Sequence, residues 1–186
     1  MTSDIHDWRI TFVDTGLTSN IGQRLKAVEK HVADEPEFLA NYSDGLTNLS
    51  LPEHVAHFRD HDAVASFLSV RPNLSIHFVT AEKGGRVTAI QDVRRFPIRI
   101  NGGYFIFRRE IFEHIGDGEE LVCEPFQKLI ESRQLVAYEH DDFWMCMDTF
   151  KDRQQLEEIY ARGGAPWQVW NGHGAPSAEA CAGAYI

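Results

Sequence analysis

The sequence has few cysteines, few positive charges and no long apolar run. Its 186 residues include three cysteines without a spacing pattern, so we expect reduced thiols and no disulfide framework. The 18 Lys and Arg residues against 28 Asp and Glu give a net charge of −10, which argues against non-specific binding to nucleic acids. No apolar run approaches the ~20 residues of a membrane span, and the polar start at Met1–Asp7 does not resemble a signal peptide. We therefore expect a cytoplasmic protein without nucleic-acid or membrane partners.

The common short motifs of catalysis are also absent: the sequence contains no Gly-rich phosphate loop, HExxH, CxxC or GxSxG. A hydrophobic content of 43% and a charged content of 25% are ordinary for a globular protein. The length suits one domain over residues 1–170, and the Gly, Ala and Pro composition predicts a flexible tail over residues 171–186.

Hydrophobic periodicity predicts alternating strands and helices, and hence an α/β fold. Strands are expected at residues 8–13, 37–41, 63–70, 75–80, 86–93, 98–107 and from 135. Helices are expected at residues 21–32, 51–61, 110–115, 119–132 and from 148. Lys83-Gly84-Gly85 stands between two alternating runs and indicates a hairpin.

Two aspartates each follow a short apolar run. Asp44 comes after Phe38-Leu39-Ala40, and ligands of open α/β sheets bind beyond the carboxyl ends of the strands. Asp148 follows the run Phe143–Met147 in the same way. The pair could hold one Mg²⁺ ion through its carboxylates. Each aspartate also has a simpler explanation, because Asp44 could cap a turn and Asp148 could be the N-cap of the last helix.

Three other clusters allow two interpretations each. The histidines His54, His57 and His61 share one face of a predicted helix; a zinc site is conceivable, but a solvated polar face is favoured. Arg94, Arg95 and Arg99 could meet a phosphate, although solvated loop arginines are favoured. The glycines in Asn101-Gly102-Gly103 interrupt a strand and indicate either a bulge or a closely approaching ligand.

Several ordered motifs together point to one family. The sequence contains W-R-I-T-F-V-D-T-G, I-G-Q-R-L-K, Y-S-D-G, I-N-G-G-Y-F-I-F, E-P-F, D-F-W-M-C-M-D-T and A-P-W-Q-V-W. From about Trp8 to Trp170 it resembles the glucose-1-phosphate cytidylyltransferases, which are sugar-nucleotide pyrophosphorylases. The resemblance implies a Rossmann-like nucleotidyltransferase fold with a mixed, mostly parallel sheet flanked by helices.

The resemblance also implies an activity and a set of site residues. In this family the sugar 1-phosphate attacks the α-phosphorus of CTP, giving CDP-glucose and pyrophosphate. By resemblance, Asp44 and Asp148 are the Mg²⁺ ligands and catalytic residues. The nucleotide-contacting positions are Ser19, Arg24 and Ser43, and the sugar-binding positions are Asn101, Gly102 and, with a weaker match, Glu124.

The sequence departs from the family pattern at its start. Intact relatives begin with a Gly-rich triphosphate loop, and here roughly the first hundred residues have no counterpart, so an N-terminally truncated fold is expected. We expect impaired cytidylyltransferase activity; the alternative is a non-catalytic binding or assembly module that pairs with an intact homologue. Because the sheet would then have an unpaired edge at residues 37–41, a homo-oligomer or a complex with an intact homologue is expected.

Overall fold

The computed structural model describes residues 8–73 and 76–171. The expected tail lies outside these residues except for Asn171. The helices are α1 (Ile21–Val32), α2 (Leu51–Arg59), α3 (Ile111–His114), α4 (Glu124–Glu131) and α5 (Phe150–Ala161), with 3₁₀ turns η1 (Val93–Arg95) and η2 (Val169–Asn171). The strands are β1 (Glu37–Ala40), β2 (Gly45–Thr47), β3 (Ala65–Val70), β4 (His77–Ala81), β5 (Val87–Asp92), β6 (Ile100–Asn101), β7 (Phe105–Arg108), β8 (Leu135–His140) and β9 (Trp144–Cys146).

The central sheet is mixed and mainly antiparallel. Its order is β1-β7-β3-β6, and β8 also pairs with β3. Within the described residues, β3–β8 is the one parallel pair, and β1–β7, β3–β7 and β3–β6 are antiparallel. The α/β class is confirmed, but the expectation of a mostly parallel sheet is wrong. After β3 the chain turns back through the β4–β5 hairpin and returns antiparallel to β3 as β6 and β7, whereas β8 is reached through α3 and α4 and runs parallel to β3.

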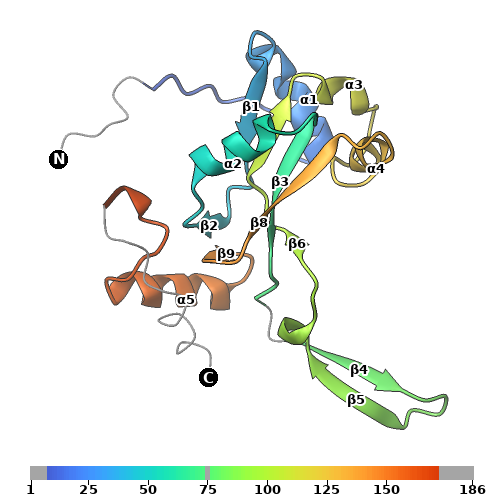
Figure 1. Ribbon diagram of the computed structural model, residues 1–186. Helices are drawn as coiled ribbons and strands as arrows, with labels where there is room; N and C mark the ends of the chain where they lie inside the picture. The colour runs from blue at the N-terminus through green and yellow to red at the C-terminus, as the bar shows by residue number, and fades with distance from the viewer. Residues whose placement is uncertain (1–7, 74–75, 172–186) are drawn as a thin grey trace.

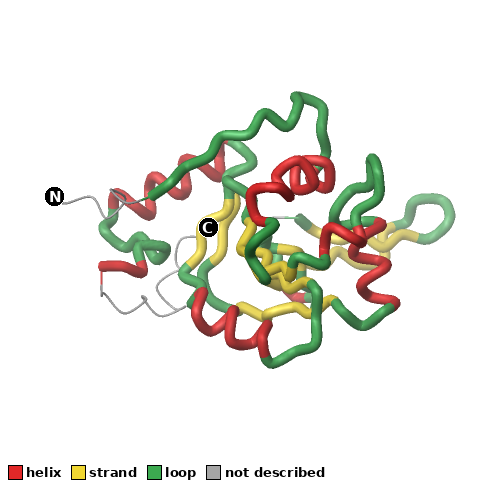
Figure 2. The backbone as a smooth tube through the Cα atoms, turned by 90° about the horizontal axis from the view of Figure 1, so that it is seen from above, coloured by secondary structure: helices red, strands yellow, loops and turns green. Residues whose placement is uncertain are grey.

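Helices cover both faces of this sheet (Figures 1 and 2). On one face, α1, α3 and α4 pack a core that includes Leu25, Phe112 and Leu129 against Phe105 and Phe107 of β7. On the other face, Phe58 of α2 packs against Ile106. Successive strand side chains point to opposite faces, so β7 contributes to both cores. No helix in the described ranges, 8–73 and 76–171, is long and apolar enough to cross a membrane.

The segment before α1 is not a strand, which corrects the expectation for Trp8–Val13. It is extended but unpaired, and the side chain of Phe12 is 92% exposed. The β-forming residues are present, but a strand also needs a neighbouring strand for its backbone hydrogen bonds. β1, the strand nearest in sequence after α1, pairs with β7 instead.

The expected hairpin is confirmed. β4 and β5 pair antiparallel and project away from the rest of the fold (Figure 1). Gly84 and Gly85 form the turn with φ values of +108° and +87°, a region that only glycine adopts without strain.

Two helices begin later than the periodicity predicts. α4 begins at Glu124 rather than Glu119, and the carboxylate of Glu119 is instead bound to the Gly116 amide and to Lys128 in the preceding turn. The N-cap of α5 is Thr149, which forms a reciprocal capping box with Asp152. The capping role considered for Asp148 is therefore wrong.

Candidate functional site

The loop between β6 and β7 is a tight turn built around Asn101. Its side-chain oxygen accepts a hydrogen bond from the Gly103 amide at 2.9 Å, and its amide nitrogen donates to the Tyr42 hydroxyl at 3.4 Å. Gly103 has a φ of +74°, and an added Cβ would lie 3.0 Å from the Asn41 side-chain oxygen. The second glycine is thus required by both backbone conformation and space.

The first glycine of this loop is held from the opposite side. The indole Nε1 of Trp144 donates to the Gly102 carbonyl at 2.9 Å. A Cβ on Gly102 would lie 3.0 Å from that nitrogen and 3.1 Å from Val70 Cγ1. Glycine therefore lets the loop lie directly against the indole.

Tyr104 joins the loop to the chain that follows β1. Its amide donates to the Asn41 side chain at 3.0 Å, and its hydroxyl donates to the Gly45 carbonyl at 2.8 Å. Burial raises the pKa of the Tyr104 hydroxyl. Burial also raises the pKa of Tyr42, against the effect of its bond to Asn101, and the negative charges of Glu120 and Asp44 add to the rise. Both phenols stay neutral near pH 7 and can donate hydrogen bonds.

The two aspartates lie at one end of the β2–β9 ribbon. Gly45 pairs with Cys146, and beyond this pair the Met147 amide donates to the Asp44 carbonyl at 2.9 Å. Asp44 and Asp148 are therefore in neighbouring backbone segments, and both are exposed. The Asp148 carboxylate accepts from the Cys146 thiol at 3.2 Å. Burial, together with this carboxylate, raises the pKa of that thiol to about 11, so it remains protonated.

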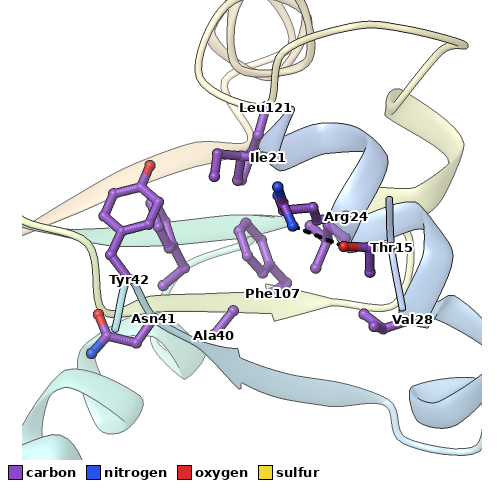
Figure 3. A pocket seen from close by; sticks show the side chains of 11 residues that line it. Thr15, Ile21, Arg24, Val28, Ala40, Asn41, Tyr42, Phe107 and Leu121 are labelled. Carbon is purple, nitrogen blue, oxygen red and sulfur yellow. Dashed lines mark hydrogen bonds between the residues drawn. The ribbon is translucent and has the colours of Figure 1, made fainter. Parts of the chain in front are cut away.

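The predicted nucleotide positions Ser19 and Arg24 lie at the start of α1. Arg24 donates to the Thr15 hydroxyl at 2.9 Å, and the Ser19 hydroxyl donates to the Thr15 carbonyl. Arg24 lines a cavity of about 310 Å³ between α1 and the sheet (Figure 3). The cavity is otherwise mainly apolar, and its lining also includes Thr15, Ile21, Leu25, Val28, Ala40, Asn41, Tyr42, Phe105, Phe107 and Leu121. Ser43 is exposed in the turn between β1 and β2.

Glu124 is the first residue of α4. Its carboxylate accepts a hydrogen bond from the Glu120 amide at 3.1 Å, which satisfies an amide in the turn before the helix. Glu120 in turn accepts from the Ile21 amide at 3.4 Å. These contacts give Glu124 a structural role, and its role in sugar binding stays a prediction.

The expectation of a solvated polar face for the three histidines is wrong for His54, whereas His61 is exposed and His57 is half-buried. His54 is fully buried, its Nε2 lies 2.9 Å from the Ser66 hydroxyl, and its ring stacks on Tyr138 at 4.9 Å. Across residues 8–73 and 76–171 no group of three His, Cys, Asp or Glu side chains is placed to hold a metal ion. Arg99, from the basic cluster, forms ion pairs with Glu139 and Asp141.

Sequence reasoning missed Asn41, Tyr104 and Trp144 as site residues. All three stand beside residues that were identified: Asn41 precedes Tyr42, Tyr104 follows Gly103, and Trp144 lies within D-F-W-M-C-M-D-T. Their position next to glycines and polar motif residues is the feature of the sequence that could have identified them. The contacts across 42 to 63 residues of chain are visible only in the folded structure.

The comparisons with known proteins agree with these motifs. No family model matches the chain. The chain is 32% identical over 168 residues to the glucose-1-phosphate cytidylyltransferases of Salmonella typhimurium and Salmonella typhi. Each match covers 89% of this chain and 65% of the relative, so the chain spans less than two-thirds of their length. The resemblance to the glucose-1-phosphate cytidylyltransferases is confirmed.

A solved structure shows the same fold at lower identity. It is described as a candidate glucose-1-phosphate thymidylyltransferase from Bacillus anthracis in complex with sucrose. The TM-score is 0.61 at 13% identity, and the match covers 80% of this chain and 64% of the other. The fold is therefore of the nucleotidyltransferase type, as the cytidylyltransferase motifs implied.

Proposed function

We propose that this chain carries the sugar- and metal-binding part of a sugar-1-phosphate nucleotidyltransferase, with glucose 1-phosphate and CTP as substrates. The observation that supports this most is the convergence of three separated motifs. The Asn101–Gly103 loop is bonded to Tyr42 of Y-S-D-G on one side and to Trp144 of D-F-W-M-C-M-D-T on the other. These same two motifs carry Asp44 and Asp148.

The donor chemistry of the aspartate pair fits Mg²⁺. Two exposed carboxylates on adjoining segments suit an ion that takes one or two protein carboxylates and completes its shell with water and phosphate oxygens. Such an ion would neutralise negative charge on the phosphates. We propose Asp44 and Asp148 as its ligands.

The remaining residues bind and orient. In the proposed reaction a phosphate oxygen of glucose 1-phosphate attacks the α-phosphorus of CTP, and pyrophosphate leaves. Asn101 and Gly102 contact the sugar, and Arg24, Ser19 and Ser43 contact the nucleotide. Holding both substrates in line lowers the barrier because their relative motion is restricted before the reaction. The Asn101 loop is suited to this role, because both of its sides are hydrogen-bonded.

The test is the binding of glucose 1-phosphate in the presence of Mg²⁺, measured by isothermal titration calorimetry. Tyr42→Phe removes the hydroxyl that accepts from Asn101 and should weaken binding roughly 3- to 10-fold, the worth of about one hydrogen bond. Tyr160→Phe, on the exposed side of α5, is the matched control and should bind normally. Lack of any binding by the unmodified chain would refute the proposal.

A second candidate function is a non-catalytic binding or assembly module that pairs with an intact homologue. The unpaired edge of β1 favours it, because such an edge can accept a strand from another chain. The two functions differ in turnover. Pyrophosphate release from CTP and glucose 1-phosphate would establish the enzyme, whereas sugar-phosphate binding without release would favour the module.

A further inference from the structure

β1 is an edge strand with one open side. It pairs with β7 from Glu37↔Arg108 to Ala40↔Phe105, and within the described residues no strand lies along its other edge. Leu39 is 55% exposed on the face opposite to Phe38. An edge with unpaired backbone groups and an exposed apolar side chain is a site for strand addition.

An apolar cavity adjoins the end of this strand. Phe38 and Ala40 point to the core that α1 covers, and Ala40 also lines the cavity of about 310 Å³. Its other walls include Ile21, Leu25 and Val28 of α1 (Figure 3). A strand added at the β1 edge would place every second side chain on this same face.

The same chain carries an unpaired segment of matching character. Trp8, Ile10 and Phe12 alternate with Arg9, Thr11 and Val13, and the three apolar side chains are 67%, 63% and 92% exposed. The pattern is that of a strand with one apolar face. We call residues 8–13 the N-terminal arm.

The arm is anchored so that it leaves its own fold. The Gly16 amide is bound to the Asp14 carboxylate, Gly16 has a φ of +86°, and Arg24 holds the Thr15 hydroxyl. From this turn the arm runs away from the body of the molecule (Figure 1). Within the described residues the arm forms no strand pair with its own β1, and the turn that follows it is held by Asp14, Gly16 and Arg24.

We propose that the arm pairs with the open edge of β1 in a second copy of this chain, and that two copies exchange arms reciprocally. Trp8, Ile10 and Phe12 cover the apolar face beside α1 of the partner, and Thr11 and Val13 lie on the side of Leu39. Each copy has one arm and one acceptor edge, so the exchange closes with two-fold symmetry. Trp8 and Phe12 of the two copies together would bury roughly 600–1,000 Å² of surface. The arm backbones and Ile10 add to this area and bring the buried surface towards that of a stable interface.

The test is the mass of the 186-residue chain in solution, by light scattering over a range of concentrations. We expect a dimer, with slow amide exchange in both the arm and β1. Phe12→Asp places a charge on the buried face of the arm and should raise the dimer dissociation constant at least 10-fold. Thr11→Asp, on the opposite face, is the matched control and should leave the dimer within about 3-fold of wild type. Both side chains are exposed in the single chain, so neither variant should unfold it.

Disulfide trapping tests whether the arm pairs with β1 of a second copy. With Cys123, Cys146 and Cys181 changed to Ser, Val13→Cys combined with Leu39→Cys should form a cross-link between copies, and Phe12→Cys with Leu39→Cys should not. A monomer with a fast-exchanging arm would overturn the proposal, as would a monomer whose arm is protected by its own β1. A dimer that Phe12→Asp leaves unchanged would also overturn it. None of these outcomes depends on the proposed enzymatic function.

Discussion

The indole nitrogen of Trp144 and the carbonyl oxygen of Gly102 lie 2.9 Å apart, although 42 residues of chain separate them. Tyr42 holds the other side of the same loop through Asn101. Asn101 and Gly102, two of the sugar-binding residues expected from sequence, are thus held by side chains from the two aspartate-bearing segments. Changes at any of these contacts should alter the loop before they alter the rest of the fold.

Gly102→Ala should destabilise the protein. The new Cβ would lie 3.0 Å from Trp144 Nε1 and 3.1 Å from Val70 Cγ1, closer than side chains tolerate without shifting. Overpacking of this kind costs about 1–3 kcal/mol in the free energy of unfolding, measurable by urea denaturation. Gly164→Ala is the control, since nothing lies within 4 Å of its added Cβ and its φ is not positive. Equal stability of the two variants would show that the loop moves freely away from Trp144.

Trp144→Phe should retain most of the packing and lose the hydrogen bond to Gly102. We expect a loss of about 1 kcal/mol in unfolding free energy, because the Gly102 carbonyl lies in a buried residue and loses its donor. Amide exchange at Gly103 and Tyr104 should accelerate. Trp167→Phe changes an indole that packs on Phe143 instead, and there the exchange of the loop should stay at its wild-type rate.

Much of this fold follows from local sequence, and the two errors in strand pairing have a common cause. The Gly84-Gly85 turn and the helical spacing of Ile21, Leu25 and Val28 need no distant partner, and the structure agrees with both. The Trp8–Val13 strand and the mostly parallel sheet depend on which segments become neighbours, and periodicity does not carry that information.

The residues of the candidate site also fall into two groups: those that the local sequence pattern indicates and those that only the folded structure reveals. Asn101, Gly102 and the two aspartates stand out because polar residues and glycines interrupt apolar runs. Trp144 and Tyr104 look like ordinary strand aromatics until the folded structure shows their hydrogen bonds. The sequence favours a solvated His54 because its helix is polar on that side, but in the structure Tyr138 of β8 stacks on its ring.

Asp44→Asn and Asp148→Asn should each weaken Mg²⁺ binding by 10-fold or more, because each removes a charged oxygen ligand from the proposed pair. Titration calorimetry with Mg²⁺ in the presence of glucose 1-phosphate measures the effect. Asp62→Asn, an exposed carboxylate after α2, controls for the loss of one negative charge. If both variants bound Mg²⁺ as the wild type does, the aspartates would be left with their hydrogen bonds to Met147 and Cys146 and no role as ligands.

The stability of the protein should fall as the pH drops from about 6.5 towards 4, and His54 should be the main cause. Burial, and then the nearby His57, lower the pKa of His54 from 6.5 to about 4. The unfolded chain therefore binds a proton in this range that the folded protein does not, so acid favours unfolding. A shift of this size corresponds to about 3 kcal/mol in the free energy of unfolding, and this loss is complete only below the pKa of the folded protein. Protonation would also leave Nδ1, which has no hydrogen-bond partner in the described structure, as a buried unpaired donor.

His54→Gln removes this titration and can still hydrogen-bond to Ser66. Its unfolding free energy, measured by urea denaturation, should change much less between pH 7 and pH 4.5 than that of the wild type. His31→Gln, on the exposed side of α1, should keep the wild-type slope. Carboxylates with lowered pKa values, such as Asp141 beside Arg71 and Glu119 beside Lys128, lose their stabilising charge only below about their ordinary pKa values, so their effect falls at lower pH. An unchanged slope in His54→Gln would show that another group carries the acid sensitivity, and His57, whose pKa is also lowered by burial, would be the first candidate.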